Sequence, residues 1–353
     1  MARLTRAQQQ ERTGAAILAA ARLEFTEHGF ADAKIDRIAE RADLTRGAVY
    51  SNFPGKRALY LAVLVDAVES ERAEPPDRSP SSAGGALGAF ARVWLERLPL
   101  VGDSAGSGHL QLRSLAGVLD SEPSRAVLAE LLTFEAVLLA LAVEPRTALR
   151  IRTTRLAQLA LTLLHGAAAL AENAPGSVDP FDVARGVEQL AGTVLTAEEE
   201  PPHLQYVPPA RAVEERWTVP RGLRNEVTGR FLDLAEDGVV VVLGAGRLSA
   251  AGEALRAARM RDDVTLVVVT GDPAETGRLV RLRIADLLGC LRRTVPAADL
   301  PQPRIVLDDA GVVPGALGVE AVDDTTELAV RVRDGLIVAR AEGRSAGYAA
   351  AVH

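Results

Sequence analysis

The sequence has few of the residues on which disulfides, metal sites and thiol chemistry depend. It contains one cysteine, Cys290, and five histidines among 353 residues. A lone cysteine excludes an intramolecular disulfide, a CxxC redox pair and a thiolate-rich zinc site. The histidines are scattered and show no HExxH or comparable ligand spacing. We therefore expect neither a bound metal nor another cofactor.

Long apolar runs are also missing. No uninterrupted run reaches the roughly 18 to 20 residues that a membrane span needs. The first residues, MARLTRAQQQERTG, lead into an amphipathic helix and not into the apolar stretch of a signal peptide. We expect a cytoplasmic protein without membrane contact.

A chain of 353 residues is too long for one ordinary core. Its charge is unevenly distributed along the sequence. The net charge is −7, yet residues 1–72 carry 11 Lys and Arg against 10 Asp and Glu. The negative net charge argues against a protein that coats nucleic acid indiscriminately. A near-neutral head on an acidic body is compatible with a small DNA-reading module.

Apolar periodicity and Pro/Gly breaks divide the chain into an all-helical part and an α/β part. In the head, residues 1–72, helices are expected at 7–29, 35–41, 46–52 and 56–70. In the body, residues 73–198, they are expected at 86–100, 107–119, 123–143, 147–172 and 179–197.

The composition changes at residues 199–222, where five prolines predict a linker. An α/β domain, residues 223–353, is expected to follow. Its strands are predicted at 239–243, 264–269, 304–307, 328–332 and 336–341, and its helices at 249–259 and 275–291. Asp334-Gly335 is a strong signal for a hairpin turn between the last two strands.

The segment Lys34 to Leu59, KIDRIAERADLTRGAVYSNFPGKRAL, has the pattern of a helix-turn-helix. A recognition helix must be short, expose small and hydrogen-bonding side chains, and be braced by a second helix through a tight turn. A miniature core is predicted from Ile35, Ile38, Leu44, Val49 and Phe53. The side chains left facing outward are those of Thr45, Arg46, Gly47, Tyr50, Ser51 and Asn52. The alternative is an ordinary helical hairpin whose charged side chains are merely solvated.

This stretch closely resembles the tetracycline-repressor (TetR) family, whose pattern reads roughly IA..AGVS.G.LY.YF..K..L. The matching positions are Ile38-Ala39, Ala42-Asp43-Leu44-Thr45, Gly47-Ala48-Val49-Tyr50, Asn52-Phe53, Lys56 and Leu59. The specific resemblance covers about residues 12–65. Asp43 stands where the family usually has glycine, a substitution that Asp tolerates because it adopts left-handed backbone more readily than most residues. Ala33 replaces the usual threonine cap, a role that Asp32 is expected to fill.

The resemblance implies sequence-specific binding of DNA. Thr45, Tyr50 and Lys56 would contact phosphates, and Arg46, Gly47 and Ser51 would lie at base edges. Small residues at Gly47 and Ala48 would let the helix approach the groove. The complete predicted interface is Lys34, Thr45, Arg46, Gly47, Ala48, Tyr50, Ser51, Asn52 and Lys56.

The resemblance also implies that the body binds an effector and forms a homodimer. The dimer interface would use residues 154–172 and 179–195, and two recognition helices would meet a palindromic operator about one DNA turn apart, ~34 to 36 Å. We expect a repressor released by an unknown small molecule, although DNA binding alone leaves activation open. Candidate effector contacts are Trp94, Leu110, Phe134, Leu138 and His165, for each of which ordinary core packing is the alternative.

The α/β domain lies beyond the usual end of TetR-like chains, and its element order resembles the thioredoxin and peroxiredoxin fold. In that fold a redox cysteine follows the first strand, where this chain has residues 244–248, GAGRL. Without a thiolate there is no thiol chemistry at that place, so we predict a redox-inactive contact module and no enzyme. The rival interpretation is a damaged dinucleotide fingerprint formed by Gly244, Gly246 and Ser249 with Asp272 after the next strand. It would make the protein a regulator fused to a nucleotide-binding or redox enzyme-like domain. Cys290 is expected to be buried and inert, with a thiol sensor as the alternative.

Overall fold

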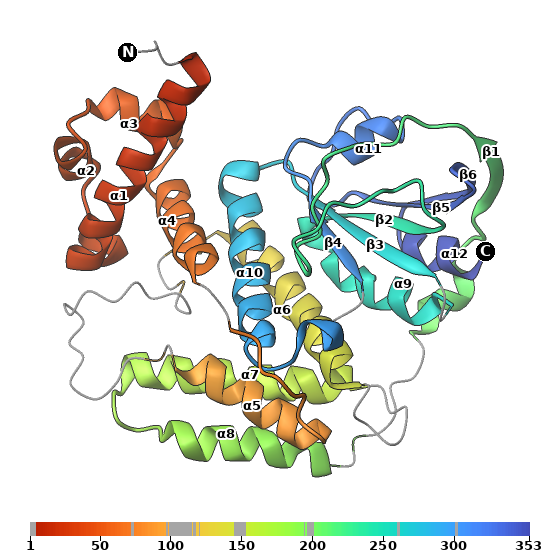
Figure 1. The fold of residues 1–353 in the computed structure, drawn as a ribbon, viewed down its shortest axis with the longest axis horizontal. Coiled ribbons are helices and arrows are strands. Elements are labelled where there is room, and N and C mark those ends of the chain that lie inside the picture. Colours follow the sequence, from red (N-terminus) through yellow and green to blue (C-terminus); the bar gives the residue numbers. More distant parts are fainter. Residues whose placement is uncertain are drawn as a thin grey trace.

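In the computed structural model, helices make up the N-terminal half and a sheet forms the core of the C-terminal domain (Figure 1). The structure describes residues 5–71, 74–96, 98, 115, 118–119, 121–144, 153–193, 195, 201–259, 262–300 and 303–353. This confirms the predicted division into a helical part followed by an α/β part.

Four helices form the head, and their ends follow local capping signals. They are α1 (Arg6–Asp32), α2 (Ile35–Arg41), α3 (Arg46–Asn52) and α4 (Lys56–Ser70). Thr5 and Gln8 form a reciprocal capping box at the start of α1. Gly29 was expected to stop the first helix; it adopts a φ of 68° and kinks the helix, which resumes for three more residues.

Four helices are described in the body: α5 (Ala83–Leu95), α6 (Glu122–Val143), α7 (Thr154–Asn173) and α8 (Pro180–Gln189). Ser82, Ser121 and Asp179 accept hydrogen bonds from the first turns of α5, α6 and α8. Most of the helix predicted at 107–119 lies outside the described residues. By length and composition α6 resembles a membrane span, but 61% of its most apolar window is buried inside the protein. This burial is typical of a central core helix.

The sheet of the α/β domain is mixed and has six strands in the order β1-β6-β5-β2-β3-β4. The strands are β1 (Arg211–Glu215), β2 (Gly238–Gly244), β3 (Asp263–Val269), β4 (Arg304–Leu307), β5 (Glu327–Arg333) and β6 (Leu336–Glu342). Strands β2, β3 and β4 run parallel, whereas β5, β6 and β1 pair in antiparallel fashion. The predicted hairpin turn is confirmed, with φ values of 50° at Asp334 and 74° at Gly335.

The two faces of the sheet pack against different partners. Val239 and Val241 belong to the same apolar core as the helical body, whereas Val240 and Val242 belong to a second core under α11 (Val312–Ala316) and the 217–234 segment. This alternation is the two-residue period of a strand. The remaining helices are α9 (Ala251–Ala257), α10 (Arg278–Arg292) and α12 (Ala346–Val352). Cys290 on α10 is 1% exposed, which confirms the predicted burial.

Strand β1 lies inside the segment predicted as a linker, and α11 and α12 were not predicted. Residues 211–215 form an edge strand whose side chains are mostly exposed, so they carry no apolar alternation. Their pairing partner is β6, more than a hundred residues away. The helices α11 and α12 are five and seven residues long, too short for a clear helical period.

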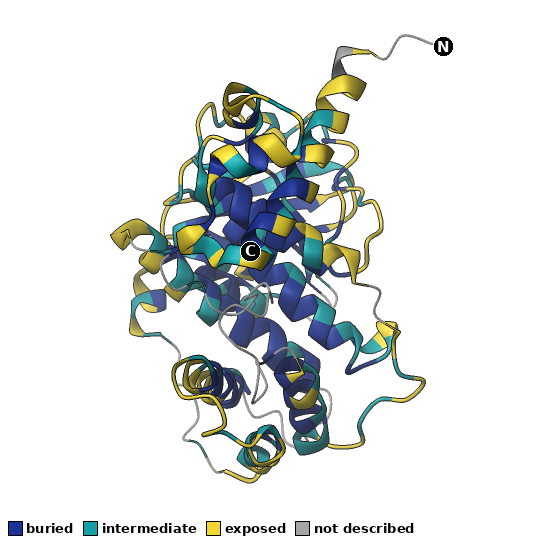
Figure 2. Cartoon of the chain, turned by 90° about the vertical axis from the view of Figure 1, so that its left-hand side faces the viewer, coloured by how far each residue is buried: buried dark blue, intermediate teal, exposed yellow. Residues whose placement is uncertain are grey.

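A buried ion pair joins the α/β domain to the helical body. Arg283 on α10 donates two hydrogen bonds of 2.7 Å to the two carboxylate oxygens of Glu135 on α6. Its guanidinium also lies 3.2 Å from Nε2 of His165 on α7, and the His165 ring packs edge-on against Trp94. The buried core runs continuously through this junction (Figure 2).

We predict that Arg283→Leu lowers the free energy of unfolding by about 3–5 kcal/mol, because it leaves the carboxylate of Glu135 buried without its charged partner. Urea unfolding followed by circular dichroism would measure the loss. The matched control is Arg293→Leu, which breaks an exposed ion pair with Glu96 and should cost at most about 1 kcal/mol. Adding Glu135→Leu to Arg283→Leu should restore stability; equal losses for Arg283→Leu and the control would contradict the assignment.

Candidate nucleic-acid interface

The turn between α2 and α3 has the geometry that the sequence predicted. Asp43 adopts a left-handed backbone with φ 54°, and the amide of Leu44 donates to the carbonyl of Ala39 at 2.9 Å. Oγ1 of Thr45 accepts a hydrogen bond of 3.2 Å from the amide of Ala48 and so caps α3. The expected tolerance of Asp in this turn is confirmed.

The predicted miniature core holds α3 against the rest of the head. Ile35, Ile38, Val49 and Phe53 are all buried, and Leu44 is half-buried. Thr45, Arg46, Gly47, Tyr50 and Ser51 are exposed on the opposite face of α3, as predicted. Asn52, which was also expected to face outward, is half-buried. Burying one stripe of a seven-residue helix therefore fixes which side chains face solvent.

Arg46 lies in the middle of this exposed face. Its side chain is 61% exposed, lies 3.2 Å from Oδ1 of Asp36, and stacks its guanidinium 5.5 Å from the ring centroid of Tyr50. The hydrogen bond to the Tyr50 hydroxyl and the charge of Asp36 raise the pKa of Arg46. A permanently charged guanidinium is thus held at the surface, where it can bind an acceptor pair on a base or a phosphate.

Three of the other predicted DNA contacts, Ser51, Asn52 and Lys56, make side-chain hydrogen bonds to the head itself. Oγ of Ser51 and Nδ2 of Asn52 both donate to the carbonyl of Ala48, so these side chains fold back on their own helix. Nζ of Lys56 donates to the carbonyls of Ala31 and Ala33 at the end of α1. Lys34 and Ala48 lie at the starts of α2 and α3, Lys34 exposed and Ala48 half-buried.

The cap of α2 differs from the sequence prediction. Asp32 was expected to cap α2, but it is the last residue of α1, and Lys34 occupies the cap position without a side-chain hydrogen bond. Glu24, a fully buried residue of α1, accepts the Lys34 amide at 3.0 Å instead and lies 3.1 Å from Nε of Arg37. Glu24, Glu27 and His28 lie close enough together to hold a metal ion. Because Arg37 and Arg41 already pair with these carboxylates, we assign the cluster to structure.

Glu275 and Arg278 of the α/β domain contact the head close to α3, and the sequence did not predict either contact. Glu275, in the turn before α10, pairs with Arg57 in the first turn of α4. Arg278 donates to the carbonyl of Ala58 at 3.2 Å, and its guanidinium lies 5.2 Å from the ring centroid of Phe53, directly after α3. We call these two residues the α10 brace. The partners lie some 220 residues apart, and no local signal links them.

The candidate effector residues lie in the core. Trp94, Phe134 and Leu138 are 2% exposed or less, and half-buried His165 contacts Arg283. Leu110 lies outside the described residues. The polar groups near Trp94 are therefore already engaged by the ion pair between Arg283 and Glu135.

Gly244, the last residue of β2, and Gly246 are closed off by the loop before β5. The amide of Gly246 donates to the carbonyl of Asp324 at 2.8 Å, and a Cβ at Gly244 would lie 2.5 Å from the carbonyl oxygen of Asp323. Asp272 accepts the amide of Glu275 and caps the following turn. A pyrophosphate needs free amides at this point of a dinucleotide fold. The geometry therefore argues against the interpretation of these glycines as a dinucleotide fingerprint.

We predict that Glu275→Gln combined with Arg278→Met loosens the head without unfolding the protein, because the contact to Arg57 loses its charge and the contacts of Arg278 to Ala58 and Phe53 are lost. Amides of α2 and α3 should exchange with deuterium about 5 to 30 times faster, the factor that corresponds to 1–2 kcal/mol. The control is Asp299→Asn, which weakens a contact between the α/β domain and Ser79 at the start of the body. Unchanged exchange in the double variant would show that the brace does not hold the head.

Comparison with known proteins matches the same segment. Residues 17–63 match the family model for bacterial regulatory proteins of the tetR family. Over 64 residues the chain is 47% identical to the HTH-type transcriptional regulator SrpR of Pseudomonas putida, which is 18% of this chain and 30% of that protein. The identity is also 47% over 64 residues to the uncharacterised HTH-type regulator TtgW, likewise from Pseudomonas putida, 47% of whose length is covered. The chain thus spans less than half of either relative.

Solved structures of TetR regulators align over about half of this chain. A TetR transcriptional regulator from Rhodococcus sp. RHA1 covers 53% of this chain and 99% of its own, with 19% identity and a TM-score of 0.33. A TetR family regulator from Cytophaga hutchinsonii covers 54% of this chain and 97% of its own, with 18% identity and a TM-score of 0.34. Over residues 17–63, the helix-turn-helix of this chain thus resembles the bacterial regulatory proteins of the tetR family.

Proposed function

We propose that the protein is a sequence-specific transcriptional regulator that reads DNA with α3 in the major groove. The observation that carries this proposal is the exposed face of α3, on which Arg46 and Tyr50 stand beside the cap residue Thr45. The opposite face packs on α2, so the helix is presented as a rigid unit. Such a short, braced helix suits the width of the major groove.

In this proposal the side chains divide the work of recognition. Arg46 pairs with the two acceptors of a guanine, and Gly47 and Ser51 face base edges. Thr45, Tyr50 and Lys56 contact phosphates, which set register and affinity. Two of the three donors of the Lys56 ammonium group are engaged at the end of α1, so in this proposal a phosphate takes the third donor or replaces one of these bonds.

We further propose that the protein acts as a homodimer on a palindromic operator. Large apolar side chains lie exposed on the two helices predicted to pair: Leu159, Leu163 and Leu170 on α7 are 41–53% exposed, and Phe181 at the start of α8 is 75% exposed. A second copy of the chain covering this face would remove that surface from water. The two-fold axis would then place two α3 helices about one DNA turn apart, ~34 to 36 Å.

We propose repression relieved by a small-molecule effector as the mode of regulation. The effector would shift the dimer from a DNA-compatible to a splayed arrangement. The coupling free energy between effector binding and DNA binding is typically about 1–3 kcal/mol. The α/β domain serves in this scheme as a redox-inactive, thioredoxin-like contact module. Its contacts to α6 through Arg283 and to the head through the α10 brace support that role.

We predict that Arg46→Ala weakens binding of the full chain to DNA from its own promoter by about 5- to 150-fold, because one bidentate base contact is lost. Fluorescence anisotropy with promoter DNA and with a scrambled duplex measures the loss of discrimination. The control is Arg22→Ala, which removes an exposed arginine of α1 that pairs with Asp66. If Arg46→Ala and Arg22→Ala weaken both duplexes alike, α3 does not read sequence.

We predict that Leu170→Glu combined with Phe181→Glu yields monomers, because four charges would face one another across the two-fold interface without counterions. Light scattering after size exclusion gives the mass. The control is Leu23→Glu, which changes a similarly exposed leucine of α1 in the head and should leave a dimer. A double variant that stays dimeric would place the interface elsewhere.

A further inference from the structure

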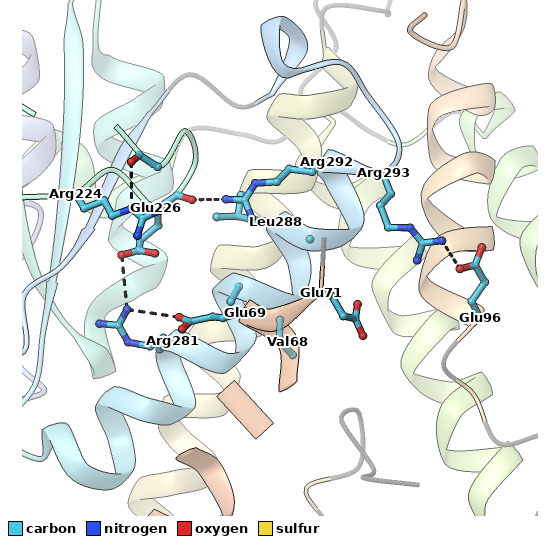
Figure 3. A pocket seen from close by; sticks show the side chains of 13 residues that line it. Val68, Glu69, Glu71, Glu96, Arg224, Glu226, Arg281, Leu288, Arg292 and Arg293 are labelled. Atoms are coloured by element: carbon cyan, nitrogen blue, oxygen red, sulfur yellow. Dashed lines mark hydrogen bonds and ion pairs between the residues drawn. The ribbon is translucent and has the colours of Figure 1, made fainter. Parts of the chain in front are cut away.

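A cavity of about 830 Å³ lies where the head, the body and the α/β domain meet (Figure 3). Its walls are the last turn of α4, the middle and end of α10, and the 224–229 loop. This volume falls within the range of about 300–1,000 Å³ that small-molecule sites occupy. The cavity is therefore large enough for an organic ligand.

The cavity combines an apolar strip with charged groups. Val68 on α4 and Ala285 and Leu288 on α10 supply the apolar part. Gly289 borders the same space, and a Cβ placed there would meet no atom within 4 Å. An organic ligand can thus lie along α10 between these residues.

The charged side chains leave many hydrogen-bond donors unused. Among described residues, Arg281 hydrogen-bonds to Asp309 and reaches Glu226 and Glu69 at 3.7 and 3.8 Å, too far for hydrogen bonds. One terminal nitrogen of Arg292 donates to the carbonyls of Glu226 and Val227. Nε of Arg224 donates to the carbonyl of Gly229. Four carboxylates, Glu69, Glu71, Glu96 and Glu226, line the same cavity. Each guanidinium has five N–H groups, however, and the hydrogen bonds above use only some of them.

Glu226 lies among these donors but competes weakly for them. Glu226 accepts no side-chain hydrogen bond from a described residue, and burial raises its pKa even though Arg281, Arg224 and Arg292 lie nearby. Burial also lowers the pKa of Arg292; the charge of Glu226 opposes this shift, and the charge of Arg224 adds a smaller lowering. An oxyanion between these guanidinium groups would relieve their desolvation and their mutual repulsion.

We propose that this junction cavity binds a small organic molecule that carries a carboxylate or phosphate group. Arg281 and Arg292 hold the oxyanion, and the apolar part of the ligand lies against Val68 and Leu288. The helical core around Trp94 is a weaker candidate, because Arg283 already occupies its polar groups. The regulatory consequence rests on the proposed function: a ligand here touches α4, which leads to α3, and α10, which carries the brace.

The probes are phenyl phosphate and benzoate, compared with benzylamine and benzamide, which share the ring and lack the negative charge. Calorimetry of the full chain without DNA should give a dissociation constant below about 10 mM for at least one oxyanion, and no binding of the amine or the amide. The two oxyanions distinguish a phosphate ligand from a carboxylate ligand. Because DNA is absent, failure of the DNA-binding proposal would leave this result unchanged.

The decisive variant is Gly289→Phe, which fills the cavity, keeps every charged group and replaces a glycine that is itself unfavourable in a helix interior. It should fold with equal or higher stability and weaken oxyanion binding at least tenfold. The control is Gly315→Leu in α11, where an added side chain also meets open space but far from the cavity; it should bind as the unmodified protein does. Equal binding by both variants, binding of benzylamine as tight as that of the oxyanions, or no oxyanion binding would overturn the proposal.

Discussion

The ion pair between Arg283 and Glu135 fixes how the α/β domain sits on the helical body. Both side chains are at most 4% exposed and share two hydrogen bonds. Desolvating two charges is costly, and their attraction offsets that cost only when the geometry is close to ideal. A small rotation of α10 relative to α6 would leave a buried charge without its partner. The pair therefore permits one arrangement of the two domains.

That arrangement makes α10 the element through which three parts of the protein meet (Figure 1). At its start, Glu275 and Arg278 hold the first turn of α4 and the residue that ends the recognition helix. In its middle, Arg283 enters the core of the body, and along its other side lies the junction cavity. The α/β domain thus packs against the first turn of α4 and against Phe53, so a change at the start of α10 would reach the end of α3 directly.

Local features of the fold followed from the sequence, because the signals that fix them are local. The bounds of α2, α3 and α4 follow from Thr45, Pro54 and the apolar spacing, and Asp334-Gly335 marks the hairpin. Features that depend on distant partners did not follow: the edge strand β1, the brace at Glu275 and the pairing of Arg283 with Glu135. A charged residue in a helix looks the same in a sequence whether it faces solvent or a carboxylate 148 positions away. The exposed face of α3 was predicted because burial of its other face is itself a local pattern.

The account depends above all on two copies of α3 entering adjacent major grooves. Footprinting of the full chain on genomic DNA from its own source, at several salt concentrations, tests this most directly. The account predicts discrete protected sites with two-fold symmetry, their half-site centres about 10 base pairs apart, that persist in excess random DNA. Weak protection without preferred sites, or single unpaired half-sites, would contradict it.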